Sequence, residues 1–383
     1  MEAQKKSAVL YIITKLELGG AQKVCLSLFK GIADETTTET FLMAGAGGIL
    51  TDSVSSNEHV IILNSFKREI SWNFIVHEIK NLITLTKKIR TLRKTYPNLI
   101  VHTHSTKAGL VGRWAAWLAG VKHRIHTIHG FAFHEHQPTY VWCAIYFLEL
   151  LASFITTHFV CVSTTDAATG TRLFPWFKQK HSIIRAAVTQ EEFYIPAQQT
   201  TPFPEATPFI FGTIACFKPQ KNMLDLLQAF AYVHQKHAHA RLEIIGDGAQ
   251  RQAIEQWIEE HKLQDVVTLH GWQGTVAPYM MQWHAFVLSS LWEGLPCAII
   301  EARLLKLPVI AYDTGGISDV ITHGKNGFLC KKQWQDLGQA MLQSCLNKTV
   351  YTALQTHVDD LEPFHNNTML AQHKNLYKNV LNT

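Results

Sequence analysis

The chain has 383 residues, of which 47% are hydrophobic and 17% charged, and its formal net charge is +5. This composition excludes a disordered chain, and the length favours two domains of unequal size. Its seven cysteines are dispersed and never spaced as CxxC. That pattern excludes an evident disulfide framework or zinc site and suits a reducing compartment.

Membrane and export signals are weak. The first apolar run is too short for the core of a signal peptide and is predicted as a strand. The one membrane-like stretch, residues 140–162, is interrupted by Glu149 and His158. We interpret it as a buried helix that breaks near Ser153-Phe154, followed by a strand. The sequence therefore predicts a cytoplasmic protein.

Short apolar runs alternate with segments of helical spacing along the chain. The runs are AVLYII, TFLMAG, VIIL, LIVHTH, RIHTIH, HFVCVS and SIIR, then FIFGTIA, RLEIIG, VVTLHG, HAFVLSS, PVIAY and GFLC. This alternation predicts parallel sheets joined by crossover helices, hence an α/β fold.

The alternation stops at residues 196–208, which hold four prolines and no periodicity. We predict a linker there, between an N-terminal domain at 1–195 and a C-terminal domain at 209–363. Two such domains facing each other would form a ligand cleft at the C-terminal ends of their strands. A last helical stretch follows Pro363.

Positive charge is concentrated in the N-terminal part. Residues 1–200 carry a net +7, the remainder a net −2, and residues 80–94 hold six basic residues without an acid. Ile79, Leu82, Ile83, Ile89 and Leu92 form a helical apolar stripe through this stretch. It is interpreted as a solvated crossover helix or as a basic helix attracted to an anionic membrane surface. No motif for nucleic-acid binding accompanies the charge.

The stretch LSSLWEGLPCAIIEA is the most informative one. It predicts a strand end, a loop with Glu293 and Gly294, and a helix that begins at Pro296. The N-terminus of that helix would form an anion site. Glu301 lies on the apolar face of its second turn and needs a partner there. A ribose diol or a neighbouring group of the chain would serve equally well.

A second loop, FKPQKN, leads into another helix. Asn222 resembles an N-cap and Asp225 the third residue of a capping box. Lys221 then stands before the positive end of a helix dipole, which is unfavourable unless an anion such as a diphosphate lies between them. The alternative is a lysine side chain that extends into water.

Two further features lie where strands end. Gly19 and Gly20 separate the first strand from the first helix, either as a phosphate loop or as an ordinary turn. His104 and His129 follow two neighbouring strands, where α/β folds place their ligands. Metal binding is unfavoured because no acidic or cysteine partner stands at ligand spacing and no DxD triplet occurs.

Together these stretches resemble the retaining, family 4 glycosyltransferases of the GT-B fold. WEGLPCAIIEA resembles the family's E-x7-E signature, FKPQKN its phosphate-lysine loop and LGGAQKV its N-terminal glycine loop. HTHSTKAGLVGR followed by TIHGF is similar to members that build bacterial polysaccharides. The resemblance covers nearly the whole chain and implies two Rossmann-like parallel-sheet domains facing across a cleft. It also implies that a C-terminal helix, residues 366–383, completes the N-terminal domain.

The resemblance implies a role for each candidate residue. Glu301 would bind the ribose hydroxyls, and Lys221 would neutralise the leaving diphosphate. His129 would approach the donor sugar from the N-terminal domain, which makes His129, Glu293 and Lys221 the implied catalytic residues. The remaining candidates are Gly294 and Leu295 for the transferred sugar, Gly19 and Gly20 for the diphosphate, and His104 on the acceptor side.

The sequence departs from the family pattern at Cys216. Many members carry an arginine at this position, and a cysteine cannot supply its positive charge. Lys218 is one candidate substitute.

The implied reaction moves a hexose-type sugar from a UDP- or GDP-linked donor to a glycan or polyprenyl-linked acceptor, with neither metal nor cofactor. The alternative is a nucleotide-sugar epimerase or hydrolase of related two-domain fold. The basic stretch and an aromatic segment with Tyr140, Trp142 and Phe147 predict peripheral association with the anionic inner face of the membrane.

Overall fold

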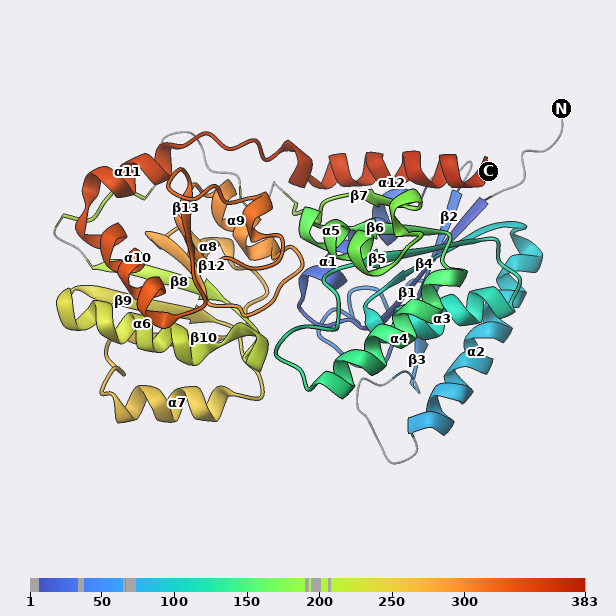
Figure 1. Ribbon diagram of the computed structural model, residues 1–383, viewed down its shortest axis with the longest axis horizontal. Helices are drawn as coiled ribbons and strands as arrows, with labels where there is room; N and C mark the ends of the chain where they lie inside the picture. The colour runs from blue at the N-terminus through green and yellow to red at the C-terminus, as the bar shows by residue number, and fades with distance from the viewer. Residues whose placement is uncertain are drawn as a thin grey trace. The chain divides into compact units, whose positions relative to one another are not determined.

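The computed structural model describes residues 7–33, 38–64, 66, 74–189, 193, 201–205 and 208–382, with side chains from residue 77 onward in the helix that begins at 74. The chain divides into two compact units (Figure 1). The first comprises Met1–Ala187 and Asn366–Thr383, and the second comprises Val188–His365. Within the predicted linker, residues 196–200, 206 and 207 lie outside the described residues.

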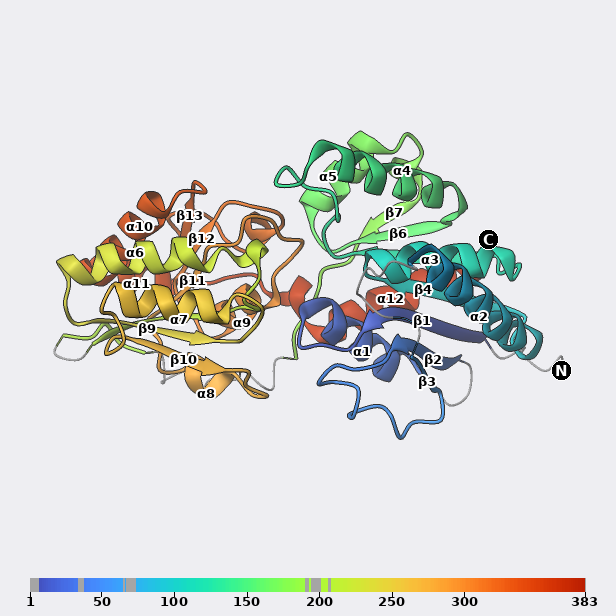
Figure 2. The same cartoon turned by 90° about the horizontal axis from the view of Figure 1, so that it is seen from below.

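The first unit is built on a seven-stranded parallel sheet with the order β3-β2-β1-β4-β5-β6-β7. Its strands are β1 Ser7–Lys15, β2 Thr38–Gly45, β3 Val60–Leu63, β4 Asn98–His104, β5 His123–Ile128, β6 His158–Cys161 and β7 His181–Ile183. In the centre, Ile12 of β1 pairs with Met43 of β2 on one side and Thr103 of β4 on the other. Figure 2 shows β6 and β7 at one end of this sheet and β2 and β3 at the other.

Helices cover this sheet. They are α1 Gly20–Ile32, α2 Phe74–Thr95, α3 Thr106–Leu118, α4 Thr139–Ile155, α5 Thr164–Leu173, the 3-10 helix η1 Phe177–Gln179 and α12 Asn366–Leu381. The C-terminal helix α12 contacts α1, while α3 lies between α2 and α4 (Figure 1). Because parallel crossovers are right-handed, the helices that follow the reversal of strand order lie on the opposite face from α1.

The second unit has a six-stranded parallel sheet with the order β10-β9-β8-β11-β12-β13. Its strands are β8 Phe209–Ile214, β9 Ala240–Ile245, β10 Val267–Gly271, β11 Ala285–Leu288, β12 Val309–Tyr312 and β13 Gly327–Cys330. Its helices are α6 Met223–Lys236, α7 Arg251–Glu260, α8 Ala277–Met280, α9 Cys297–Leu304, α10 Trp334–Leu346 and α11 Lys348–Thr356, with 3-10 helices η3 Pro219–Lys221, η4 Ile317–Asp319 and η5 Glu362–Phe364.

The predicted fold class is confirmed, because each of the thirteen apolar runs forms a strand and both sheets are parallel. The predicted apolar stripe of α2 is wrong in part. Leu85 and Ile89 are fully buried, whereas Ile79 and Ile83 are 51% and 49% exposed. The helix packs against the rest of the unit through the face that bears Leu85 and Ile89, so the side chains of Ile79 and Ile83 face outward.

The membrane-like segment is α4 followed by β6. The predicted helix end near Ser153-Phe154 is confirmed to within one residue, because α4 ends at Ile155 and β6 begins at His158. No helix among the described residues is long and apolar enough to cross a bilayer.

The charge inside this apolar helix has a partner. Glu149 is buried and its carboxylate accepts from the guanidinium of Arg113 in α3 at 2.7 Å. Arg113 is fully buried and also donates to the Gly109 carbonyl and the Thr156 hydroxyl. The pair joins α3 to α4, and each charge makes the burial of the other tolerable.

Replacing Glu149 with alanine should therefore destabilise the first unit. The substitution leaves the Arg113 guanidinium buried without a counter-charge, and breaking such a pair typically costs about 3–5 kcal/mol. Urea denaturation measures the loss. The matched control is Glu58→Ala, whose side chain is 91% exposed. An equal, small loss in both variants would show that the buried pair does not stabilise this unit.

Candidate active site

The strand order of the second unit reverses at β8. Strand β9 lies on one side of β8 and β11 on the other. All strands are parallel, so the loops that follow β8 and β11 leave the same edge of the sheet and diverge there. Such a reversal is where α/β sheets bind their ligands. The two most informative sequence motifs occupy these two loops.

The structure brings Lys221 and Glu293 together. The Lys221 ammonium lies 2.5 Å from a Glu293 carboxylate oxygen, although 72 residues separate them in sequence. Their side chains are only 15% and 10% exposed. The loops are also joined through Gln220, whose carbonyl accepts from the Leu291 amide (2.8 Å) and whose side chain donates to the Trp292 carbonyl (2.6 Å). The ion pair is therefore held by a fixed backbone.

The predicted capping box at Asn222 is wrong. Asn222 has left-handed backbone angles, φ 47° and ψ 50°, and its side chain makes no capping hydrogen bond within the described chain. An N-cap side chain ordinarily needs extended backbone angles to reach the helix amides. The Asp225 carboxylate instead accepts from the Tyr312 hydroxyl at 2.7 Å. Lys221 still directly precedes the N-terminal end of α6, as the sequence indicated.

The loop that follows β12 packs against the Glu293 loop. The Gly316 amide donates to the Gly294 carbonyl at 2.6 Å. Gly315 has φ +57°, and a Cβ there would stand 2.1 Å from the Glu293 carbonyl oxygen. Only glycine fits this approach. Leu295, the next candidate along the chain, is 7% exposed. The sequence did not predict the part played by the glycine pair after β12.

Glu301 lies in α9, which begins at Cys297 directly after Pro296. It is 4% exposed, as its position on the apolar face predicted. The N-terminus of α9 directly follows the Glu293 loop, and a helix N-terminus favours anions. The Lys221–Glu293 ion pair and the N-terminus of α9 thus lie at one edge of the sheet.

In the first unit the strand order reverses between β1 and β4. Gly19 and Gly20 follow β1 and begin α1, and Gly19 has extended backbone angles that any residue adopts. The hydroxyls of Thr14 and Ser105 lie 3.0 Å apart and link the ends of the two strands. The glycine pair and His104 therefore stand at the corresponding reversal of this sheet.

His104 and His129 are also brought together. Nδ1 of His104 lies 3.0 Å from Nε2 of His129. His104 is fully buried, which lowers its pKa well below the ordinary value, and the charges of the nearby His102 and His129 add to this. Burial, followed by the charge on His373, lowers the pKa of His129 to about 3. Both rings are neutral at pH 7.

His102 has a different role from that of its neighbour. It is buried, with Nδ1 2.6 Å from the Tyr377 hydroxyl of α12 and Nε2 2.7 Å from the Thr127 hydroxyl. It fixes the C-terminal helix to the sheet. His102 and His104 stand two residues apart and therefore on the same face of β4, so alternation along the strand does not separate the structural histidine from the candidate one.

No cluster of three or more metal-ligating side chains occurs in the described parts of the chain. Cys216, at the position where an arginine is common, is half-buried and carries a free thiol. A hollow of about 270 Å³ beside the Lys221 loop is lined by Pro219, Met223 and Leu291 among others, and none of the predicted site residues lines it.

Comparisons with known proteins agree with this geometry. A sequence model described as glycosyl transferases group 1 matches residues 197–355, and one described as a glycosyl transferase 4-like domain matches residues 76–179. The chain is 30% identical over 321 residues to an Escherichia coli UDP-Gal:alpha-D-GlcNAc-diphosphoundecaprenol alpha-1,3-galactosyltransferase, covering 82% of this chain and 81% of that protein.

Two solved structures are similar over almost the whole chain. Anabaena Alr3699/HepE in complex with UDP and glucose has a TM-score of 0.78 at 16% identity, covering 97% of this chain and 99% of that one. The sucrose-phosphate synthase of Thermosynechococcus elongatus has a TM-score of 0.79 at 18% identity, covering 98% and 100%. These similarities establish the fold.

Fold and site define a glycosyltransferase of the GT-B fold. The chain belongs to the family 4 glycosyltransferases, as the sequence motifs indicated. Lys221, Glu293 and Glu301 lie within the first matching region, and His104 and His129 lie within the second.

Glu301→Gln should weaken nucleoside diphosphate binding while leaving the fold intact. If Glu301 accepts from ribose hydroxyls, the loss of one charged hydrogen bond corresponds to about 1.5–3 kcal/mol. Calorimetric titration with UDP measures it, and Glu259→Gln, on the exposed face of α7, is the control. Equal UDP affinity in Glu301→Gln and the parent would remove Glu301 from the site.

Proposed function

We propose that the chain is a retaining, metal-independent glycosyltransferase of surface polysaccharide biosynthesis. It would move a hexose-type sugar from a UDP- or GDP-linked donor to a glycan or polyprenyl-linked acceptor. The observation that carries the proposal is the Lys221–Glu293 pair at the strand reversal of the second unit. A cation held there beside two helix N-termini suits a diphosphate leaving group.

The similar proteins support the donor class. The E. coli relative is named for UDP-Gal, and the Anabaena structure holds UDP and glucose. In this chain, Lys221 would bind the diphosphate, Glu301 the ribose, and Glu293 with the Gly294–Leu295 backbone the transferred sugar. Gly19 and Gly20 would contribute from the first unit. UDP-linked hexoses are therefore the first donors to test.

Donor binding would change the partner of Lys221. In the structure its charge is neutralised by Glu293 at 2.5 Å. A diphosphate that approaches the ammonium competes with this carboxylate and frees it to accept from sugar hydroxyls. The pair thus keeps both groups neutralised and aligned until the donor arrives, which lowers the reorganisation needed on binding.

The chemical step follows from this arrangement. The bond between the anomeric carbon and the diphosphate oxygen breaks, and the acceptor hydroxyl forms a new bond on the same face. Its proton passes to the departing phosphate oxygen. The negative charge that develops on the leaving group is stabilised by Lys221 and the α6 and α9 N-termini. His129 would meet the sugar on the side of the first unit.

Transfer should require an acceptor and survive chelation. We expect a sugar-extended product from UDP-galactose and a polyprenyl-diphosphate-linked GlcNAc, with turnover unchanged by EDTA because Lys221 replaces a metal. Chromatography of the lipid product measures it. Loss of turnover in EDTA that manganese or magnesium restores would contradict the metal-independent site. Release of UDP and free sugar at the same rate without acceptor would indicate the epimerase or hydrolase alternative.

We further propose that the first unit docks on an anionic membrane surface, as a peripheral protein on the cytoplasmic face. Helices α2, α3 and α4 form one row, with α3 in the middle. On α2, Lys80, Lys87 and Lys94 are exposed. On α4, Phe147 and Phe154 are 57% and 61% exposed. Basic and apolar side chains on one layer suit a bilayer interface.

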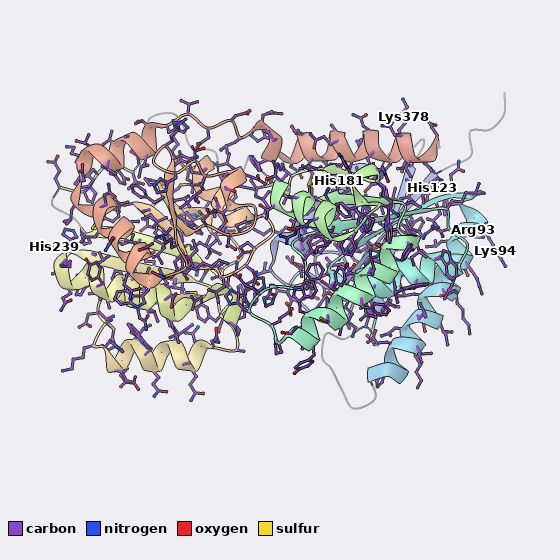
Figure 3. All side chains as sticks on the ribbon, in the orientation of Figure 1. Arg93, Lys94, His123, His181, His239 and Lys378 are labelled. Carbon is purple, nitrogen blue, oxygen red and sulfur yellow. The ribbon has the colours of Figure 1, made fainter. Side chains whose placement is uncertain are left out.

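Three of the predicted membrane residues also have partners within the first unit. The Arg90 guanidinium donates to the Leu118 carbonyl and that of Arg93 to the Ala119 carbonyl, so both hold the end of α3. Figure 3 labels Arg93 and Lys94 near the end of α2. Trp142 stacks on Tyr146 inside the unit, with ring centroids 5.2 Å apart.

Changing Lys80, Lys87 and Lys94 together to glutamine should weaken binding to anionic liposomes. Each basic residue near such a surface is worth about 1 kcal/mol, so the loss is on the order of 100-fold in partitioning. Co-sedimentation with anionic and neutral liposomes measures it, and salt should weaken binding in the same direction.

The control changes three exposed lysines of the second unit, Lys236, Lys262 and Lys325, to glutamine. It removes the same charge and should leave binding unchanged. Equal losses in both triple variants, or binding indifferent to lipid charge and salt, would mean that α2 is only a solvated crossover helix.

A further inference from the structure

The contact between His104 and His129 occupies one nitrogen on each ring. Nδ1 of His104 faces Nε2 of His129 at 3.0 Å. A neutral imidazole has one N–H and one lone pair, so one ring must donate and the other accept. Since burial keeps both rings neutral, two arrangements of the protons remain. They differ in what His129 offers at Nδ1, its only other ring nitrogen.

The other ring nitrogen of His104, Nε2, distinguishes the two arrangements of the protons. Nε2 of His104 is buried and has no hydrogen-bond partner among the described residues. If His104 accepted at Nδ1, its proton would sit on Nε2 as a buried N–H without an acceptor. If His104 donates from Nδ1, only a lone pair is left unused at Nε2. An orphaned buried N–H is the rarer and more costly of the two.

We infer that His104 is a positioning residue that donates from Nδ1 to Nε2 of His129 and so fixes His129 with its proton on Nδ1. The contact with His104 occupies Nε2 of His129, so Nδ1 is the ring nitrogen left to meet a ligand. It then acts as a hydrogen-bond donor to an oxygen of the donor sugar and does not act as a general base. The sugar contact rests on the proposed function, whereas the protonation state does not.

This assignment has a physical consequence for the reaction. A neutral N–H aimed at a sugar oxygen orients the hexose without taking a proton from the acceptor. The acceptor's proton is then left to the departing phosphate, as the proposed chemistry requires. Because His104 is fixed in β4 and fully buried, the donor direction of His129 is set before the ligand binds.

Nitrogen-15 NMR of the full chain with labelled histidine tests the proton positions without any substrate. Long-range proton–nitrogen spectra distinguish a protonated from a bare ring nitrogen, and His129→Asn identifies the His129 signals by their loss. We expect His129 to be protonated at Nδ1 and bare at Nε2. A His129 ring protonated at Nε2 in the parent chain would overturn the inference, whatever the enzyme's activity.

Two variants of His104 separate positioning from packing. In His104→Leu, His129 should sample both proton positions, whereas the amide N–H of His104→Asn stands near the lost Nδ1 and should restore the parent signals. His129 signals that stay unchanged in His104→Leu would overturn the inference. If the leucine variant does not fold, the parent spectrum and the asparagine variant still decide the matter.

Binding provides the second readout. Loss of one neutral hydrogen bond predicts that His104→Leu weakens the binding of UDP-galactose by about 2- to 13-fold. The affinity for UDP should stay unchanged, and His104→Asn should bind UDP-galactose about as tightly as the parent. Equal weakening of UDP and UDP-galactose would contradict the sugar contact. Absence of UDP binding to the parent would instead count against the proposed function and leave the NMR result intact.

Discussion

The reversal of strand order in each sheet is the constraint on which the rest of the site depends. Between β8 and β11 it makes two loops diverge from one edge, and between β1 and β4 it does the same in the first unit. In the second unit the diverging loops carry Lys221 and Glu293, and the backbone around Gln220 joins them again. A ligand that enters there meets charge from two loops and the amides of α6 and α9. The strand order therefore determines where the candidate site lies, and the side chains of the two loops determine which groups it presents.

Buried charge is paired in both units, by Arg113 with Glu149 in the first and by Arg303 with Asp359 in the second. Arg113 and Glu149 neutralise each other between α3 and α4, where no ligand replaces either partner. The Lys221–Glu293 pair also joins a cation to a carboxylate, but it lies at a strand reversal, where we propose that a diphosphate replaces the carboxylate. The histidine cluster of the first unit avoids charge altogether, because burial lowers the pKa of His104 and of His129. Each solution keeps a polar interior without an uncompensated ion.

Much of this architecture could be predicted from the sequence because it is local. Every strand corresponds to an apolar run, and the two acids of WEGLPCAIIEA stand one loop and one helical turn apart, which the pattern itself specifies. Predictions that needed tertiary context were less successful. The capping box failed because Asn222 adopts left-handed backbone angles, and the apolar stripe of α2 failed because packing buries only one side of it. The contact of Lys221 with Glu293, the approach of Gly315 and the pairing of His104 with His129 join distant segments, and no single-sequence periodicity encodes such contacts.

The strand reversal of the second unit is the proposed binding site for the nucleoside diphosphate of the donor. Hydrogen–deuterium exchange of the full chain, with and without saturating UDP, tests it directly. We expect UDP to slow amide exchange in two segments far apart in sequence, residues 216–223 and 289–301, because both loops then contact one ligand. UDP that binds while leaving both segments unprotected would contradict it.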